Sequence, residues 1–376
     1  MFERIKPMLI KEFIHVLRDK KMAVILFIAP VLQVLIFGYA LTIDVKHVAT
    51  AVYDLDNSVA SRELVARFVK SGYFDVVEYI NDDSRTRSLL DHSKVSVVLR
   101  MNKGFEEDLR AGRTAQLQVI VDGTDSNTAG IVLDYAGKIA WQFSRKVLTM
   151  RFTRLMGPGQ KPAQVELQTR AWFNENLESR NYYQPGVIAL IVTTTTLILT
   201  SMAVVREKEV GTMEQIMVTP ITPMEFIIGK TVPFALIGYI EVILIILVSV
   251  FWFEIPIRGN LLLLFLATTL YLVTTLGAGL LISTISQTQQ QAMMSSVLFY
   301  FPVMFLSGFA FPISNMPEVV QRLTYLNPLR YFLVIIRGIF LKGVGISILW
   351  PQMAALAIMG LVTLWLASRR FRKTLA

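Results

Sequence analysis

Six long apolar stretches dominate this sequence, and they limit the chain to folds in which whole helices lie in an apolar environment. The first, from Met22 to Ile43, has 22 residues without a charge, which is enough for one helix to cross a bilayer. The others lie at 185–205, 231–253, 261–285, 292–311 and 346–367. With 53% hydrophobic and 17% charged residues, the chain is too apolar for an ordinary soluble protein of 376 residues. We therefore expect a polytopic α-helical membrane protein with six transmembrane helices.

The net charge of +9 raises the question of nucleic-acid binding, but its distribution argues against it. Residues 1–21 include six basic and three acidic side chains, residues 368–376 include four basic and none acidic, and residues 44–184 include nineteen basic and eighteen acidic. The excess therefore lies beside predicted membrane helices, where positive charge marks the cytoplasmic side. We expect both termini in the cytoplasm, no nucleic-acid partner, and an interfacial helix at 1–21 in contact with lipids.

Residues 44–184 differ from the rest of the chain because their charge content is ordinary. Four strand-like runs, at 48–53, 74–80, 95–101 and 117–122, alternate with helical patterns. A long helix is predicted from Asn127 to Met156, where Gly157 ends it. This pattern predicts an inserted α/β domain between the first and second membrane helices. Because one crossing precedes it and the N-terminal tail is basic, we expect the domain outside the cytoplasm.

The residues 206–230 form a short polar segment between the second and third apolar stretches, and we call it the coupling segment. Apolar residues recur in it at helical spacing, at Val210, Met213 and Met217. Three glutamates indicate a solvated face: Glu207, Glu209 and Glu214. The pattern predicts an amphipathic helix that lies in the water phase.

A second helix is predicted to begin inside the coupling segment. Pro220 ends the first helix. Thr222 is a suitable N-cap, Pro223 suits the first turn, and Glu225 completes a capping box. This second helix continues through Lys230 into the third apolar stretch.

Residues 312–345 are too charged and too often interrupted to cross a bilayer. Pro312, Pro317 and Pro328 separate short amphipathic pieces, and Arg330 is one of several basic residues among aromatic ones. Irregular backbone at membrane depth has to be covered by protein or water. We therefore expect extracytoplasmic re-entrant helices here, before the last crossing at 346–367 and a tail at 368–376.

Several motifs resemble those of ABC-2 type transporter permeases. Arg206-Glu207 followed by Gly211-Thr212-Met213-Glu214 resembles the cytoplasmic coupling helix of that family. Four more motifs stand in the family's order: Leu306-Ser307-Gly308-Phe309-Ala310-Phe311-Pro312-Ile313, Met316-Pro317, Leu326-Asn327-Pro328-Leu329-Arg330-Tyr331 and Arg337-Gly338. The layout of spans and insert extends the resemblance over the whole chain, and it is most similar to the drug-exporter-like branch with a large periplasmic insert.

The resemblance implies a function and partners. Such a chain is a transport subunit rather than an enzyme, and it binds no cofactor itself, because a separate ATPase subunit holds ATP and magnesium. Two permeases, as a homodimer or as two paralogues, pair with two ATPases in the bacterial inner membrane, and a periplasmic adaptor can join them. ATP-driven closure moves the coupling helices, and an amphipathic, drug-like or lipid-like substrate passes outward.

Within the coupling segment we expect Glu207, Gly211, Thr212 and Glu214 to contact the ATPase. Glu207 and Glu214 are seven residues apart on one helical face, and carboxylates there are suited to basic residues of a partner. Gly211 allows close backbone approach. The alternative is a solvated helix face with an incidental glycine.

Glu241 lies near the centre of the third apolar stretch. A charge there costs about 2.5 to 3.5 kcal/mol on insertion scales, so it marks a water-filled path, a partner or a protonated group. One hypothesis places Glu241 on the substrate pathway, where it favours cationic amphipathic molecules. The alternative is a hydrogen bond to another helix, for example to Thr194 or Gln287.

Other chemistry is not indicated by the sequence. Gly229-Lys230-Thr231 matches the end of a phosphate-binding loop, but position 224 holds Met224 instead of the required glycine. A lysine that reaches the water at the end of a membrane helix explains Lys230 better. The three histidines are far apart in the sequence, so we expect no metal site and no catalytic residue.

Two other classes of function remain open. In one, the chain is a membrane-anchored sensor or assembly platform whose outer domain binds a ligand or protein, although anchoring needs fewer spans. In the other, it is an ion-coupled secondary transporter that uses Glu241, although no internal repeat of broken helices is visible. Substrate identity, the choice between homodimer and heterodimer, and the use of an adaptor also remain open.

Overall fold

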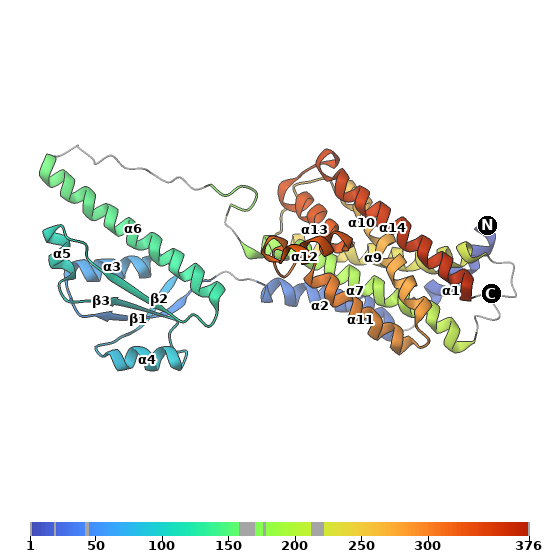
Figure 1. Ribbon diagram of the computed structural model, residues 1–376, viewed down its shortest axis with the longest axis horizontal. Coiled ribbons are helices and arrows are strands. Elements are labelled where there is room, and N and C mark those ends of the chain that lie inside the picture. The colour runs from blue at the N-terminus through green and yellow to red at the C-terminus, as the bar shows by residue number, and fades with distance from the viewer. Residues whose placement is uncertain are drawn as a thin grey trace. The chain divides into compact units, whose positions relative to one another are not determined.

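The computed structural model describes residues 2–18, 20–41, 45–157, 170–175, 178–211 and 222–374 (Figure 1). The chain divides into two compact units. One comprises Ile43–Thr169, and the other comprises Met1–Thr42 together with Arg170–Ala376. The first unit corresponds to the predicted insert, although it ends at residue 169 rather than at 184, because the residues from 170 onward belong with the helical unit.

The smaller unit is an α/β domain. Its strands are β1 (Val48–Asp54), β2 (Phe74–Tyr79), β3 (Val97–Met101) and β4 (Leu117–Val121), and its helices are α3 (Val59–Lys70), α4 (Asp83–Asp91), α5 (Phe105–Ala111) and α6 (Ser126–Met156). These four predicted strands and the predicted long helix are therefore confirmed. A further strand expected at 165–173 lies partly outside the described residues, and residues 170–173 are not in a strand.

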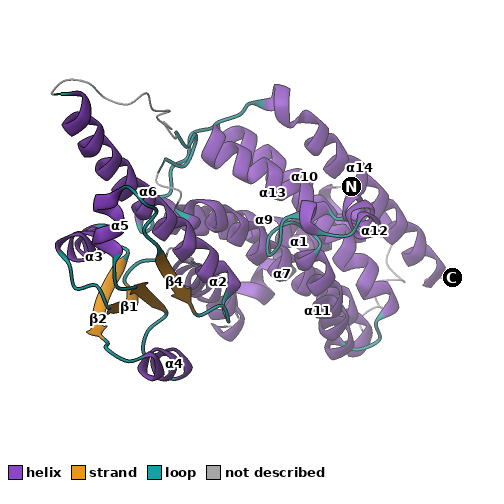
Figure 2. Cartoon of the chain, turned by 60° about the vertical axis from the view of Figure 1, so that its left-hand side comes forward, coloured by secondary structure: helices purple, strands orange, loops and turns teal. Residues whose placement is uncertain are grey.

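The sheet has the order β2-β1-β3-β4, with β1 parallel to both β2 and β3 and with β4 antiparallel to β3. The chain crosses from β1 to β2 through α3, and then from β2 past β1 to β3 through α4. Because crossovers between parallel strands are right-handed, this reversal places α3 and α4 on opposite faces of the sheet, as Figure 1 and Figure 2 show.

Strand β1 is the centre of the domain because both of its faces are covered. Val48 and Val52 pack in one apolar cluster with residues of α3, α5 and α6. Ala51 and Tyr53 pack in another cluster with Leu89 of α4. A strand buried on both faces is a nearly continuous apolar run, which is why this stretch is easy to recognise in the sequence.

Asp56 holds the start of α5 against the end of β1. Its carboxylate accepts hydrogen bonds from the backbone amides of Gly104, Phe105 and Glu106, at 2.8, 3.1 and 3.1 Å. Partial burial raises the pKa of Asp56, but the hydrogen bonds from Ser58 and from these three amides outweigh it, so the pKa lies below the usual value of an aspartate. The carboxylate therefore stabilises the fold in its charged form.

Replacing Asp56 with alanine is expected to open the start of α5. Loss of such a capping carboxylate costs about 1–2 kcal/mol, and hydrogen exchange at the amides of residues 104–106 is the measurement. Because the pKa of Asp56 is lowered on folding, the stabilisation is complete above about pH 4, the unfolded value, and declines as the pH falls further. Asp91→Ala, which removes an exposed carboxylate 3.8 Å from Arg87, is the control. Unchanged exchange in Asp56→Ala would refute this role.

The larger unit is helical. It contains α1 (Phe2–Arg18), α2 (Lys20–Ala40), α7 (Ser179–Val210), α9 (Pro223–Phe251), α10 (Leu261–Ile285), α11 (Gln289–Phe305), α12 (Glu318–Leu323), α13 (Pro328–Arg337) and α14 (Ile346–Thr374), with the short turns η1 (Ile313–Asn315), η2 (Thr324–Leu326) and η3 (Gly338–Lys342).

Four helices in the described part of this unit are long and apolar enough to cross a membrane: Ser179–Val210, Glu225–Phe251, Leu261–Ile285 and Ile346–Arg370. The apolar part of α2, Leu26–Ala40, is shorter, and α11 has 17 residues. The chain is thus a helical membrane protein with several spans. The six-helix topology stays a prediction.

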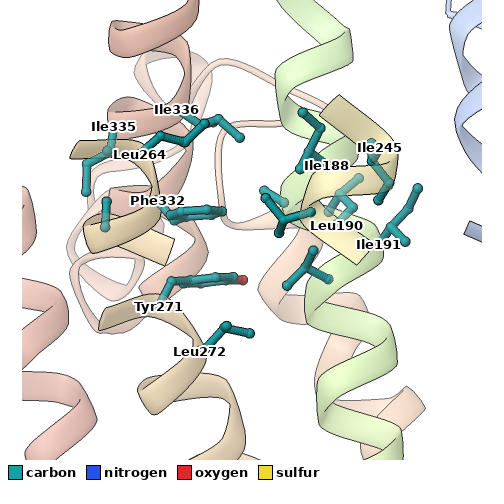
Figure 3. Close-up of a cluster of buried hydrophobic side chains, with 14 of the residues drawn as sticks. Ile188, Leu190, Ile191, Ile245, Leu264, Tyr271, Leu272, Phe332, Ile335 and Ile336 are labelled. Atoms are coloured by element: carbon teal, nitrogen blue, oxygen red, sulfur yellow. The ribbon is translucent and has the colours of Figure 1, made fainter. Parts of the chain in front are cut away.

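The core of the helical unit forms where α7, α9, α10, α13 and α14 meet. Its centre is a stack of the Tyr271 ring of α10 on the Phe332 ring of α13, with centroids 4.2 Å apart (Figure 3). Both side chains are fully buried. Ile188 and Ile191 of α7 belong to the same cluster.

The threonine run at 193–196 connects α7 to its neighbours. Thr193, Thr194 and Thr196 each donate to the backbone carbonyl four residues earlier, so each hydroxyl finds a hydrogen-bond acceptor within its own helix. The Thr193 hydroxyl also contacts the Tyr271 hydroxyl of α10, and the Thr196 hydroxyl lies 3.1 Å from the Thr275 hydroxyl of α10. Hydroxyls in an apolar helix need such partners, and they fix α10 beside α7.

The predicted start of α9 is confirmed in detail. Thr222 is the N-cap, Pro223 is the first helical residue, and Glu225 forms a capping box with Thr222. Other predicted boundaries differ. Helix α7 already begins at Ser179, and α14 continues as far as Thr374, so the predicted tail at 368–376 begins as a continuation of that helix rather than as a separate segment.

Residues 312–345 form short helices, as the prolines predict. Pro312 precedes η1, Pro317 precedes α12, and Pro328 is the first residue of α13. Proline fits these positions because the first turn of a helix needs no backbone donor there. Their position in the membrane stays a prediction.

Candidate functional site

The coupling segment begins as a direct continuation of α7. The helix runs through Arg206 to Val210 and ends at Gly211, whose φ of 75° is left-handed. Glycine adopts this conformation without strain, and it is the usual residue just after a helix. The predicted site residues Thr212 and Glu214 lie outside the described residues, which resume at Thr222.

The expectation that Glu207 lies on a solvated face is wrong. The residue is 6% exposed, whereas Val210, expected on the apolar face, is 67% exposed. The Glu207 carboxylate accepts from Lys230 of α9 at 2.7 Å and from Lys11 of α1 at 3.0 Å. The carboxylate that was expected to bind an ATPase is thus paired with two lysines of the same chain.

Lys230 is buried as well, contrary to the expectation that it reaches the water. The residue is 2% exposed, and besides Glu207 its ammonium group donates to Glu12 of α1 at 2.5 Å. We call Lys11, Glu12, Glu207 and Lys230 the ion cluster. A buried ammonium group is stable only with such partners.

Lys208 joins the end of α7 to the end of α10. Its ammonium group lies 3.2 Å from the carbonyl oxygen of Ser283 and 3.5 Å from that of Ser286. The last carbonyls of a helix have no partner within the helix and carry partial negative charge, so a lysine stabilises them.

Glu209 joins α7 to the start of α11. Here a carboxylate meets the N-terminus of a helix, whereas Lys208 places an ammonium group at a C-terminus. The carboxylate accepts from the backbone amide of Gln289 at 2.9 Å and from the Gln289 side chain at 2.5 Å. A carboxylate is favourable at a helix N-terminus, where amides are unpaired. Three consecutive residues, 207 to 209, therefore connect α7 to α1, α9, α10 and α11.

Glu241 of α9 is completely buried, at 0% exposure. Neither of its carboxylate oxygens has a hydrogen-bond partner in the described part of the chain. The Thr195 hydroxyl of α7 approaches the carboxyl group, but the contact does not meet the geometry of a hydrogen bond. Thr194 and Gln287, the two examples given for a partner on another helix, form no hydrogen bond with Glu241 in the described part of the chain.

The C-terminal motif residues have structural partners. The three prolines begin short helices. Arg330 donates to the Thr324 hydroxyl and lies 4.1 Å from the centroid of the Tyr325 ring, so it holds α13 against the turn before it. Arg337 donates to the Tyr182 hydroxyl at 3.0 Å, which connects α13 to α7.

Two residues of the ion cluster, Lys11 and Glu12, were not predicted as site residues. Their signal in the sequence is weak, since Glu12 is one of three acids in a basic N-terminal region. Within the described ranges, no group of three or more histidine, cysteine, aspartate or glutamate residues is arranged to hold a metal ion.

Replacing Glu207 with glutamine is expected to destabilise the helical unit strongly. The change leaves Lys230 with Glu12 as its remaining carboxylate and removes the carboxylate that pairs with Lys11, and removing one partner of a buried ion pair costs about 3–5 kcal/mol. Thermal unfolding of the purified protein in detergent is the measurement. Glu209→Gln removes an exposed charge two residues away, and a much smaller effect is expected because water screens that charge. Equal effects of the two changes would contradict the burial of Glu207.

Comparison with known proteins identifies related chains. Residues 20–369 match the family described as "ABC-2 family transporter protein". The chain is 33% identical to "Probable multidrug ABC transporter permease YbhR" of Escherichia coli over 99% of both chains. It is 33% identical to "Probable multidrug ABC transporter permease YbhS" of the same organism, over 98% of this chain and 97% of the relative. It is 29% identical to "Inner membrane transport permease YhhJ" of Escherichia coli, over 97% and 96%.

Proposed function

Because this chain belongs to the ABC-2 transporter family, we propose that it is the permease subunit of an ATP-driven exporter. A separate ATPase subunit binds ATP and magnesium and supplies the energy. Two permeases, two copies of this chain or this chain and a paralogue, form the pathway in the bacterial inner membrane. Both termini lie in the cytoplasm, and the α/β unit lies outside it, where it meets a periplasmic adaptor.

The observation that carries this proposal is the set of contacts at the end of α7. Glu207, Lys208 and Glu209 connect this end to four other helices through charged contacts, directly before residues 212–221. A push on those residues therefore reaches α1, α9, α10 and α11 together. In a sensor or assembly platform, the end of a helix that only anchors the protein in the membrane would need no such connections.

In this proposal the residues of the coupling segment divide into two groups. Gly211, Thr212 and Glu214 contact the ATPase, and Glu214 supplies the charge that binds it. Glu207, which was expected to share that role, transmits the movement inward instead, because Lys11 and Lys230 already pair with it.

Reversing the charge of Glu214 is expected to release the ATPase. The protein is expressed with its native neighbours, extracted gently, and the ATPase that co-purifies is quantified. Like charges at such an interface cost several kcal/mol, so Glu214→Lys lowers recovery by more than about tenfold. Glu254→Lys, at an exposed acid after α9, is the matched control and keeps the ATPase. Wild-type protein that is folded but carries no ATPase would contradict the proposal and favour a sensor or an ion-coupled transporter.

We also propose that Glu241 lies on the substrate pathway and that the exported molecules are amphipathic cations. The support is a carboxyl group that is fully buried and has no hydrogen-bond partner in the described part of the chain. An unpartnered charge at this depth is costly, and a cation beside it removes the cost. The relatives named as multidrug permeases are consistent with a broad range of substrates.

Glu241→Gln keeps the size of the side chain and removes its charge. The attraction between a carboxylate and a cation about 8 Å away is about 2 kcal/mol at an effective dielectric constant of about 20, so export of tetraphenylphosphonium falls about tenfold or more. Export of the neutral analogue triphenylphosphine oxide stays the same. Transport into inverted vesicles containing the whole complex is the measurement, and equal transport of tetraphenylphosphonium by both proteins would remove Glu241 from the pathway.

A further inference from the structure

We propose that α1 is a driven part of the transporter and that the ion cluster positions it, so that α1 moves together with both flanks of residues 212–221. Glu207 and Lys230 act here as positioning residues. This inference rests on the proposed ATP-driven function. Helix α1, Phe2–Arg18, precedes residues 20–369 that match the family, so the family match does not assign it a role.

The ion cluster is a closed chain of contacts that begins and ends on α1. Lys11 of α1 lies 3.0 Å from Glu207 of α7, Glu207 lies 2.7 Å from Lys230 of α9, and Lys230 lies 2.5 Å from Glu12 of α1. Neighbouring residues of α1 therefore hold both a residue before and a residue after the stretch 212–221. Neither flank can shift along α1 without breaking one of these contacts.

The charges of the ion cluster balance, which makes the contacts costly to break. Two lysines face two glutamates. The side chains of Lys230, Glu12 and Glu207 are only 3%, 7% and 8% exposed, whereas Lys11 is 47% exposed. Separation of α1 would leave buried charges without partners. Ion pairs with fixed partners also define the register of α1 on α9, which apolar contacts alone leave free.

A steric contact at the same place supports this assignment independently. A Cβ atom at Gly229 would lie 2.7 Å from the sulfur of Met8 in α1, so the side chain of Met8 packs closely on the backbone of α9 here. Met8 is one helical turn from Glu12, and Gly229 adjoins Lys230. Met8 also packs against an apolar cluster of residues from α7, α9, α10 and α14: Val204, Phe226, Ile227, Leu280 and Ala367.

The arrangement suggests a variant that disconnects α1 alone. In Lys11→Met/Glu12→Gln, both α1 charges are absent, but the pair between Glu207 and Lys230 remains and the cluster is still neutral. The single variant Glu12→Gln leaves two lysines and one glutamate. If the cluster only stabilises the fold, the neutral double variant regains full function, whereas the single variant does not.

The experiment measures tetraphenylphosphonium exported per ATP hydrolysed by the whole complex in vesicles. For Lys11→Met/Glu12→Gln we expect normal assembly and ATP hydrolysis, but a ratio lowered about fivefold or more, in the range of typical coupling energies. Lys6→Met, at an exposed lysine of α1, is the control and keeps the wild-type ratio.

An unchanged ratio in the double variant, with the complex assembled, would overturn the role of α1 and leave the proposed function intact. A wild-type chain that neither binds an ATPase nor exports with ATP would overturn the proposed function itself. The two failures are therefore distinguishable. Loss of assembly in the double variant but not in Lys6→Met would also overturn the inference, because α1 would then be needed for structure rather than for coupling.

Discussion

The arrangement of the helical unit depends on the burial of one ammonium group. Lys230 is almost inaccessible and donates to carboxylates from two different helices. A buried cation is costly without such partners and strongly favours them when they are present. Its pairing with Glu12 and Glu207 therefore fixes the ends of α1, α7 and α9 relative to one another. Lys208 and Glu209, which follow Glu207 in α7, connect the same end of α7 to α10 and α11.

Helix α7 connects the ion cluster to the core of the helical unit. The threonine run at 193–196 bonds α7 to α10 in the middle of the unit, and Tyr182 near the start of α7 accepts from Arg337 of α13. One helix thus has polar contacts near both ends and at its centre: with α13 near its start, with α10 at its centre, and with α1, α9, α10 and α11 at its end. In the proposed function, α7 transmits a displacement along its length through these contacts. This property is what the proposed coupling between the ATPase and the substrate pathway requires.

The sequence predicts those features that depend on local chemistry. The capping box of Thr222 and Glu225 and the helix starts at Pro317 and Pro328 are local, and they are confirmed. The strands of the α/β unit also follow from apolar runs and turn residues. The orientation of Glu207 could not be predicted, because a polar helix face has the same spacing whether it meets water or charged side chains of other helices. Its partner Lys11 is 196 residues away, and no local pattern records such a pairing.

The central claim, that α1 and α9 move as one body, can be measured directly. The chain has no cysteine, so spin labels at Lys6→Cys in α1 and at Leu236→Cys, a half-exposed position of α9, report one distance. In the assembled complex we predict the same narrow distance distribution without nucleotide and with ATP trapped. In Lys11→Met/Glu12→Gln the distribution broadens or shifts between the two states. A distance that changes by several ångströms in the otherwise unaltered chain would show that α1 moves independently, and it would contradict this account.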